Sequence, residues 1–239
     1  MRKGLIYDRW VVEDSGPPLS GQPRAAVFHI HPVIAEILHR RGITTEDEYR
    51  RFVAPSIADL HDPAGIHGIG AACERIERAV RDKETILIYG DYDVDGVTSI
   101  VLLQTVLRDG YGLKLEVLER VLAERDVRLV ITVDCGITSV EPVRRAIDLG
   151  IDVIITDHHL PPGVLPDAAA VLNPKQPGCA YPFKELAGVG VAFKLCCELI
   201  RRAGKNISTE SLLKIAAIGT VADVAPLIGE NRTIAWLGL

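Results

Sequence analysis

The sequence has no long apolar run and few aromatic residues. Of its 239 residues 48% are hydrophobic, but only 5% are aromatic. No uninterrupted apolar stretch approaches the ~20 residues of a membrane-spanning helix. The start of the chain, residues 1–10, carries charges where a signal peptide would have its apolar segment. We therefore predict a soluble, cytoplasmic protein without a membrane partner, which has enough apolar residues to bury a core.

Paired cysteines and an excess of positive charge are also missing. The five cysteines are odd in number and form no C-x-x-C pair, which argues against a disulfide framework and a zinc site. Lys and Arg total 27 against 32 Asp and Glu, for a net charge of −5. This balance disfavours binding of nucleic acid by a coat of basic side chains. It is compatible with a pocket of carboxylates that holds divalent cations, because bound ions restore positive potential locally.

The chain divides by pattern into two regions. Residues 1–82 are predicted to form a small, mostly helical N-terminal region, with helices near 33–38, after 44–47 and over 71–81. In residues 83–239, short predicted strands whose two faces are both apolar are separated by helical patterns. This order predicts an α/β domain whose largely parallel sheet carries helices on both faces. The predicted strands are Ile86–Tyr89, Leu129–Val133 and Val153–Thr156, and the predicted helices are Val97–Leu107, Lys114–Arg125, Ser139–Leu149, Val189–Arg202 and Thr209–Gly219.

Acidic and histidine side chains follow each of the three predicted strands. The carboxyl ends of parallel strands lie along one edge of a sheet, where ligands of open α/β sheets bind, so these side chains are expected to converge. A further carboxylate, Asp223, follows a helix in an otherwise apolar stretch and requires a partner. The side chains after the strands are Asp91, Asp93 and Asp95, then Asp134, then Asp157, His158 and His159.

Carboxylates and imidazoles gathered in one crevice repel or shift their pKa values unless cations lie among them. Hard oxygen ligands with one or two histidines suit Mn²⁺ or Mg²⁺. Two such ions ~3.5–4 Å apart, bridged by a shared carboxylate, activate water and stabilise the leaving oxygen in phosphoester hydrolysis. The pattern therefore predicts a hydrolase of phosphoesters that uses two metal ions.

Other interpretations of the same residues are weaker. The run D-Y-D-V-D-G at 91–96 resembles the opening of an EF-hand calcium loop, but the twelfth position is Leu102 and a strand precedes the loop. One of its three carboxylates is expected to cap the following helix, yet three are more than a cap needs. Isolated histidines are usually structural, whereas His158 and His159 lie beside two other acidic strand ends.

At these residues the sequence resembles the DHH phosphoesterase family, whose motif stands here at residues 157–159. The likeness to its RecJ branch covers nearly the whole chain, including Phe52 and Asp62-Pro63 in the N-terminal region. The segments that carry it, in order and spacing, are YGDYDVDG (89–96), VDCGIT (133–138), NPKQPGC (173–179), AGVGVAFK (187–194) and GTVADV (219–224).

The resemblance implies a role for each matched residue. Asp134 would bridge the two ions and would act in catalysis together with His158 and His159. Asp157 would orient a ligand histidine, His159 would face the scissile phosphate, and Tyr111 and Asn173 are further candidates for substrate binding. The implied metal ligands are Asp93, Asp95, Asp134, His158 and Asp223, with Asp91 as an additional ligand or a neighbour of one.

The resemblance also implies an activity, the 5′→3′ removal of nucleotides from single-stranded DNA with a 5′ phosphate, in DNA repair and recombination, with Mn²⁺ or Mg²⁺ as cofactor. Two alternatives stay open: a DHH hydrolase of short oligonucleotides, cyclic dinucleotides or pyrophosphate, and a non-catalytic scaffold or inactive fragment.

The sequence departs from the family pattern in two places. A strand and loop expected before residues 110–113 are missing. Arg108-Asp109 therefore joins the preceding helix directly to residues 110–113. No segment resembles the DHHA1 domain or an OB-fold, so weak exonuclease activity is expected of this chain alone. The predicted partner is therefore a DHHA1 domain or a repair or replication protein. Its predicted contact is an exposed face formed by Leu212, Leu213, Ile215 and Ile218.

Overall fold

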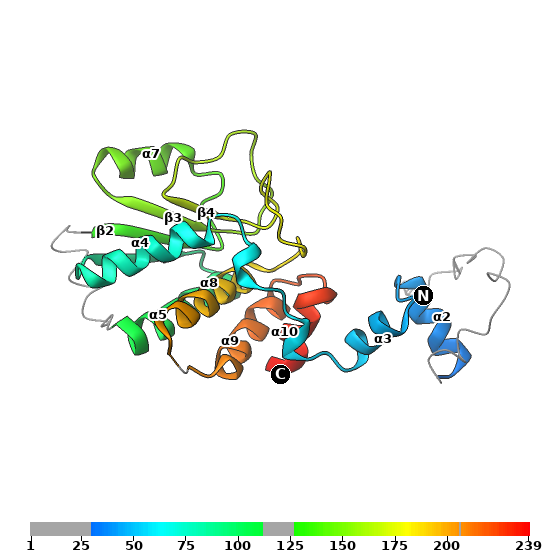
Figure 1. Cartoon of the computed structure of the whole chain (residues 1–239). Helices are drawn as coiled ribbons and strands as arrows, with labels where there is room; N and C mark the ends of the chain where they lie inside the picture. The colour runs from blue at the N-terminus through cyan, green and yellow to red at the C-terminus, as the bar shows by residue number, and fades with distance from the viewer. Residues whose placement is uncertain (1–29, 112–126, 206) are drawn as a thin grey trace, which may run out of the picture. The chain divides into compact units, whose positions relative to one another are not determined.

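A computed structural model describes residues 30–111, 127–205 and 207–239 (Figure 1). The chain forms two compact units, Met1–Val53 and Ala54–Leu239. The predicted helix Lys114–Arg125 lies outside the described residues. Among the residues that are described, no helix combines the length and the apolar character needed to cross a bilayer.

The described part of the first unit consists of two short helices, as predicted. Helix α2 (Pro32–Arg40) begins with a proline, and its preceding residue, His31, accepts a hydrogen bond from the Val33 N–H at 3.3 Å. Helix α3 (Glu46–Val53) follows a turn that Glu48 stabilises, because its carboxylate accepts the N–H groups of Thr44 and Thr45. These hydrogen bonds lower the pKa of Glu48 to about 2.

A parallel sheet of four strands, in the order β1-β2-β3-β4, organises the second unit. The strands are β1 (Thr85–Gly90), β2 (Val127–Val133), β3 (Asp152–Thr156) and β4 (Ala170–Leu172). The first three confirm the predicted strands. The sequence pattern missed β4, which is three residues long and too short to show a periodicity.

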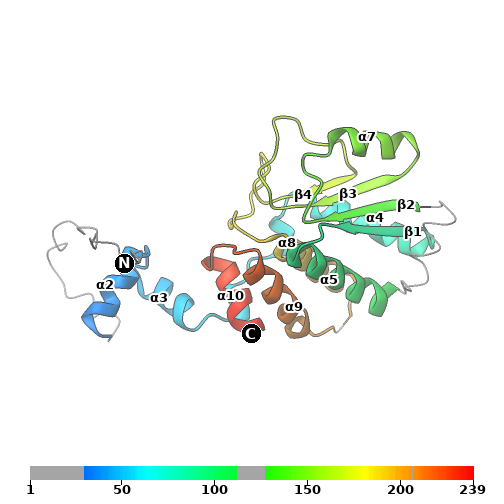
Figure 2. The same cartoon turned by 180° about the vertical axis from the view of Figure 1, so that it is seen from behind.

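Helices cover both faces of this sheet, as the sequence predicted (Figures 1 and 2). One face packs against the main core, which α4, α5 and α8 build together with Ile88, Leu129 and Ile131 of the strands. The other face packs against α7, where Val143 meets Val153 and Ile155. The helices of the second unit are α4 (Ile69–Arg81), α5 (Val94–Tyr111), α7 (Val140–Asp148), α8 (Gly188–Ala203), α9 (Thr209–Ala222) and α10 (Gly229–Gly238), with short 3₁₀ turns η1 (Ile57–Asp59) and η2 (Pro63–Gly65).

The boundary between the units lies after Val53, whereas the sequence pattern placed it at residue 82. Helix α4 belongs to the second unit because its apolar side, including Ile69, Cys73 and Ile76, is fully buried in the main core. Helical periodicity showed that α4 is amphipathic, but the partner of its apolar side lies more than fifty residues further along the chain in β4 and α8.

A buried ion pair joins α8 to α10. Lys194 and Glu230 are each 1% exposed, and Lys194 Nζ lies 2.5 Å from Glu230 Oε1. Lys194 also donates to the His61 carbonyl at 2.7 Å, and Tyr181 Oη donates to Glu230 Oε2 at 2.6 Å. Every charge in this cluster has several partners, which a buried ion requires.

The apolar side chains of α9 correct one further prediction. Leu212 and Leu213 are 1% and 0% exposed, because α9 packs against α5, α8 and α10. They are therefore part of the core and not part of an exposed face. Ile218, from the same predicted set, is 51% exposed.

Candidate metal centre

The four strands end at one edge of the sheet, and each is followed by a polar residue. Asp91 follows β1, Asp134 follows β2, Asp157 follows β3 and Asn173 follows β4. Asp223, the residue that follows α9, approaches the same place, since its Oδ2 lies 4.0 Å from His158 Nδ1. The predicted convergence at the carboxyl edge is therefore present.

The loop between β1 and α5 uses its carboxylates in different ways. Asp93 Oδ1 accepts the Gly96 N–H at 2.9 Å and so caps the start of α5. Asp91 Oδ1 accepts the N–H of Tyr92 at 2.6 Å. A Cβ atom at Gly96 would overlap the carbonyl of Asp91, so this tight turn requires glycine. The expectation that one of the three carboxylates is a helix cap is correct, and the capping residue is Asp93.

Asp95 caps a different helix. Its Oδ2 accepts the Gly188 N–H and its Oδ1 accepts the Val189 N–H, both at 2.7 Å. The residue before α8 is Ala187, whose side chain cannot accept a hydrogen bond, so Asp95 replaces the missing local cap. Burial, followed by the charge of Asp134, raises the pKa of Asp95 to about 7. No spacing in the sequence indicates this contact between two distant motifs.

Asp134 has a strained backbone and a buried carboxylate. Its φ angle is +57°, in the left-handed region that non-glycine residues rarely adopt, and the residue is 2% exposed. A Cβ atom at Gly188 would lie 2.5 Å from Asp134 Oδ1, so the carboxylate fits only against a glycine. The neighbouring thiol of Cys135 has a pKa raised to about 11, mainly by burial, and therefore stays protonated.

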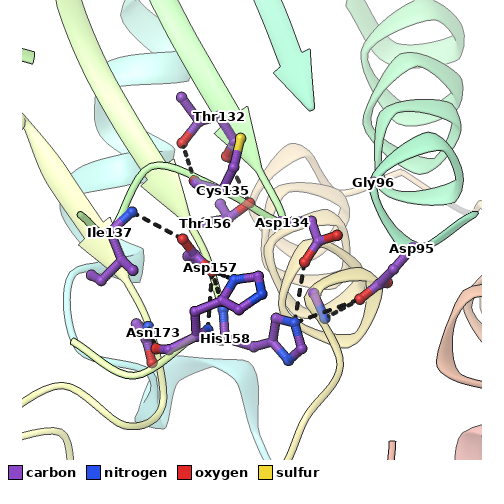
Figure 3. Close-up of polar contacts among 12 residues, drawn as sticks. Asp95, Gly96, Thr132, Asp134, Cys135, Ile137, Thr156, Asp157, His158 and Asn173 are labelled. Atoms are coloured by element: carbon purple, nitrogen blue, oxygen red, sulfur yellow. Dashed lines mark hydrogen bonds and ion pairs between the residues drawn. The ribbon is translucent and has the colours of Figure 1, made fainter. Parts of the chain in front are cut away.

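His158 lies between three carboxylates, two of which appear with it in Figure 3. Its Nε2 is 3.1 Å from Asp134 Oδ1 and 3.9 Å from Asp95 Oδ2. Yet neither His158 Nε2 nor Asp134 Oδ1 has a hydrogen bond of acceptable geometry, although both atoms are buried. Two buried, unsatisfied ligand atoms that face each other suit a bound cation.

The ligand atoms form two sets of three, and in each set all three atoms lie within 4.8 Å of one another. One set is Asp134, His158 and His159, and the other is Asp95, His158 and Asp223. Hard carboxylate oxygens with imidazole nitrogen suit Mn²⁺ or Mg²⁺, so the residues fit the predicted type of ion.

The electrostatics of the centre agree with this fit. Burial raises the pKa values of Asp134 and Asp223 above the ordinary value of an aspartate. Burial alone would lower the pKa of His158, but the adjacent carboxylates, Asp134 foremost, raise it. In the absence of a cation the centre therefore retains protons, and a divalent ion would replace them.

Asp157 holds the DHH segment in place. Its Oδ1 accepts the N–H groups of His158 and His159 at 2.7 and 3.0 Å, and its Oδ2 accepts the Ile137 N–H at 2.9 Å. The same Oδ1 lies 2.7 Å from His159 Nδ1, so that Nδ1 carries the proton and Nε2 is the free ring nitrogen. The imidazole that Asp157 orients is thus that of His159, whose side chain is 58% exposed.

Other predicted residues have different positions. Asn173 is fully buried; its amide donates to the His159 carbonyl and accepts the Lys175 N–H, both at 2.8 Å. Its side chain therefore positions the loop, and a contact between Asn173 and substrate stays a prediction. Asp91 and Asp93 belong to neither set of three, although the charge of Asp93 raises the pKa values of Asp134 and Asp223. Tyr111 is the last residue of α5, and its side chain is outside the described part of the chain.

Comparison with known proteins finds similar sequences and a similar solved structure. The single-stranded-DNA-specific exonucleases RecJ of Bacillus subtilis and Escherichia coli are 47% and 38% identical to this chain, over 89% and 87% of its length. The chain spans only 28% and 40% of these relatives. The crystal structure of RecJ from Thermus thermophilus in complex with Mn²⁺ matches with a TM-score of 0.73 and 32% identity, covering 90% of this chain and 32% of that one.

The family assignment follows from the motif and from its match. Residues 85–220, more than half of the chain, match the model of the DHH family, N-terminal domain. This range contains all four strands and every residue of the centre except Asp223. The chain belongs to the DHH family.

Proposed function

We propose that this chain provides the metal centre of a RecJ-like exonuclease, which hydrolyses phosphodiester bonds of single-stranded DNA with divalent metal ions. The similarity to RecJ proteins supports the substrate, and RecJ structures bound to Mn²⁺ or Mg²⁺ support the type of ion. The observation that carries the proposal is the facing pair of buried, unsatisfied atoms on Asp134 and His158.

Different residues of the proposed centre bind the metal ions and the phosphate. Asp95, His158 and Asp223, together with Asp134, would hold one ion. Asp134, with help from Asp93 and Asp91, would hold a second. When bound, the ions supply an activated water and neutralise charge at the phosphate. His159, exposed and fixed by Asp157, presents its free Nε2 to the phosphate of the strand.

The direction of digestion, 5′→3′ from a 5′ phosphate, belongs to the same proposal and is supported by the RecJ resemblance. We also propose that a further region completes the site, because the curated relatives are much longer than this chain. Positioning of the strand contributes up to ~7–11 kcal/mol to a barrier in favourable cases. Activity of the 239-residue chain alone is therefore expected to be weak.

The test is release of labelled mononucleotides from a DNA strand that carries its label on the 5′ phosphate, with Mn²⁺, and with a circular strand and a dinucleotide in parallel. Asp134→Asn is expected to reduce the rate by more than ~100-fold, because even residues that only support metal ligands contribute 10–100-fold. Asp148→Asn is the matched control, since Asp148 is exposed at the end of α7.

Cleavage of the linear strand but not of the circular one supports the proposal. Cleavage of the dinucleotide alone would favour the hydrolase of short substrates. If Asp134→Asn and Asp148→Asn both cleave as the wild type does, the hydrolysis does not occur at this centre.

A further inference from the structure

The loop after β4 places a lysine in a fixed relation to the DHH histidine. The buried amide of Asn173 donates to the His159 carbonyl and accepts the Lys175 N–H, both at 2.8 Å. One side chain thus fixes the backbone of both residues. Figure 3 shows Asn173 directly beside the DHH segment. Lys175 is therefore held near the residue that the proposed function places against phosphate.

The ammonium group of Lys175 has an exchangeable partner. Its Nζ lies 3.6 Å from Glu185 Oε2, too far for a hydrogen bond of normal length, and the two side chains are 22% and 46% exposed. A partly exposed ion pair of this kind contributes little to stability, so its separation costs little. Burial raises the pKa of Asp223, and the positive charge of Lys175 offsets a part of this rise, so the charge of Lys175 acts on the metal centre.

A phosphate group is the ligand that fits this arrangement. Described side chains at the centre are mainly carboxylates, which repel an anionic strand, whereas a lysine near the centre attracts one. A lysine binds phosphate as a mobile point charge and does not need the planar geometry of arginine. A weak resting partner such as Glu185 keeps the ammonium group near the centre until a stronger anion arrives.

We infer that Lys175 leaves Glu185 on substrate binding and contacts a phosphate of the strand next to His159. The inference rests on the proposed function for its substrate, a nucleotide phosphate. Glu185 then competes with the phosphate for the same ammonium group. This competition makes the two substitutions act in opposite directions.

The experiment measures binding of thymidine 5′-monophosphate to the Mn²⁺-loaded 239-residue chain by calorimetry, together with strand hydrolysis. Lys175→Met is expected to weaken binding about 10-fold, as loss of a charge-assisted hydrogen bond does. Glu185→Gln should tighten binding about two- to fivefold, within the range of a surface ion pair. The double variant should bind as Lys175→Met does, because the competitor has no effect once the lysine is gone.

Three controls separate phosphate binding from structural damage. Lys214→Met removes an exposed lysine from α9 and should leave nucleotide affinity unchanged. Mn²⁺ affinity of Lys175→Met should be equal to or higher than that of the wild type, because one repulsive charge near Asp223 is lost. Lys175→Arg should restore most of the nucleotide affinity.

The outcomes distinguish this inference from the proposed function. If nucleotide binding follows the expected pattern but no strand is hydrolysed, the role of Lys175 stands and the exonuclease proposal fails. If Lys175→Met binds the nucleotide as the wild type does, or the wild type binds none, the inference is wrong. It is also wrong if Glu185→Gln has the same effect with and without Lys175.

Discussion

The metal-free centre is expected to make folding stability depend on pH. Its carboxylates have raised pKa values, and Asp95 changes from the ordinary 3.8 to about 7. Between these two values the folded chain holds a proton that the unfolded chain has lost, so stability must fall as the pH rises. His158 acts in the same direction, because its raised pKa stabilises the folded state at low pH and this contribution is lost as the pH rises through it.

The magnitude follows from the shift of Asp95. One pKa unit corresponds to about 1.36 kcal/mol, so between about pH 5.5 and 7 a single retained proton changes the stability by about 2 kcal/mol. For a domain of this size, about 1 kcal/mol changes Tm by about 2–4 °C. The metal-free protein is thus expected to melt about 4–8 °C lower at pH 7 than at pH 5.5.

The assay is thermal unfolding after dialysis against a chelator, in buffers from pH 5.5 to 8 at constant ionic strength. Asp95→Asn should flatten the dependence, although its Tm is expected to fall at every pH, since an amide oxygen replaces only one of the two acceptors for Gly188 and Val189. Mn²⁺ should raise Tm most at high pH, because there it no longer competes with protons. A metal-free Tm that is constant or rises with pH would refute the reasoning.

Two further predictions concern packing. Gly188→Ala should weaken Mn²⁺ binding about 10–100-fold, because the added Cβ would lie 2.5 Å from Asp134 Oδ1, whereas Gly163→Ala, with no atom within 4 Å, should have no effect. Lys194→Met should lower the free energy of unfolding by about 3–5 kcal/mol in urea titration, because Glu230 is left buried and unpaired. Replacing both partners with apolar residues should cost less, and an equal or larger cost would contradict this account.

Local patterns were sufficient to predict the main part of the fold and the place of the site. In runs such as Leu129–Val133, the side chains on both faces of the strand are mainly apolar, which identified these runs as central strands. The rule that parallel strands end at one edge then brought Asp134 and His158 together, and the structure places their ligand atoms 3.1 Å apart. Strand β4 showed no such pattern because it has only three residues.

Contacts between distant segments could not be predicted from local patterns. The partners Asp95 and Gly188 are 93 residues apart, and no spacing in the sequence relates them. The buried side of α4 is indistinguishable, by periodicity alone, from the face of a separate helical region, because its partners lie in β4 and α8. The burial of Asn173 and its contact with the His159 carbonyl likewise depend on the position of the DHH loop, which no local pattern indicates.

The cap that Asp95 provides explains why the centre needs the segment around Gly188 as well as the acidic motif. A helix that is preceded by an alanine has no side-chain cap for its first N–H groups, and Asp95, in the first turn of α5, supplies both acceptors. The positive end of α8 in turn favours negative charge on Asp95 and on the neighbouring Asp134. Asp93, by contrast, caps the helix of its own motif, α5, because its carboxylate accepts the Gly96 N–H. Alternate carboxylates of one motif thus order two helices, and the glycine at the start of α8 leaves room for the carboxylate of Asp134 beside the helix end that Asp95 caps.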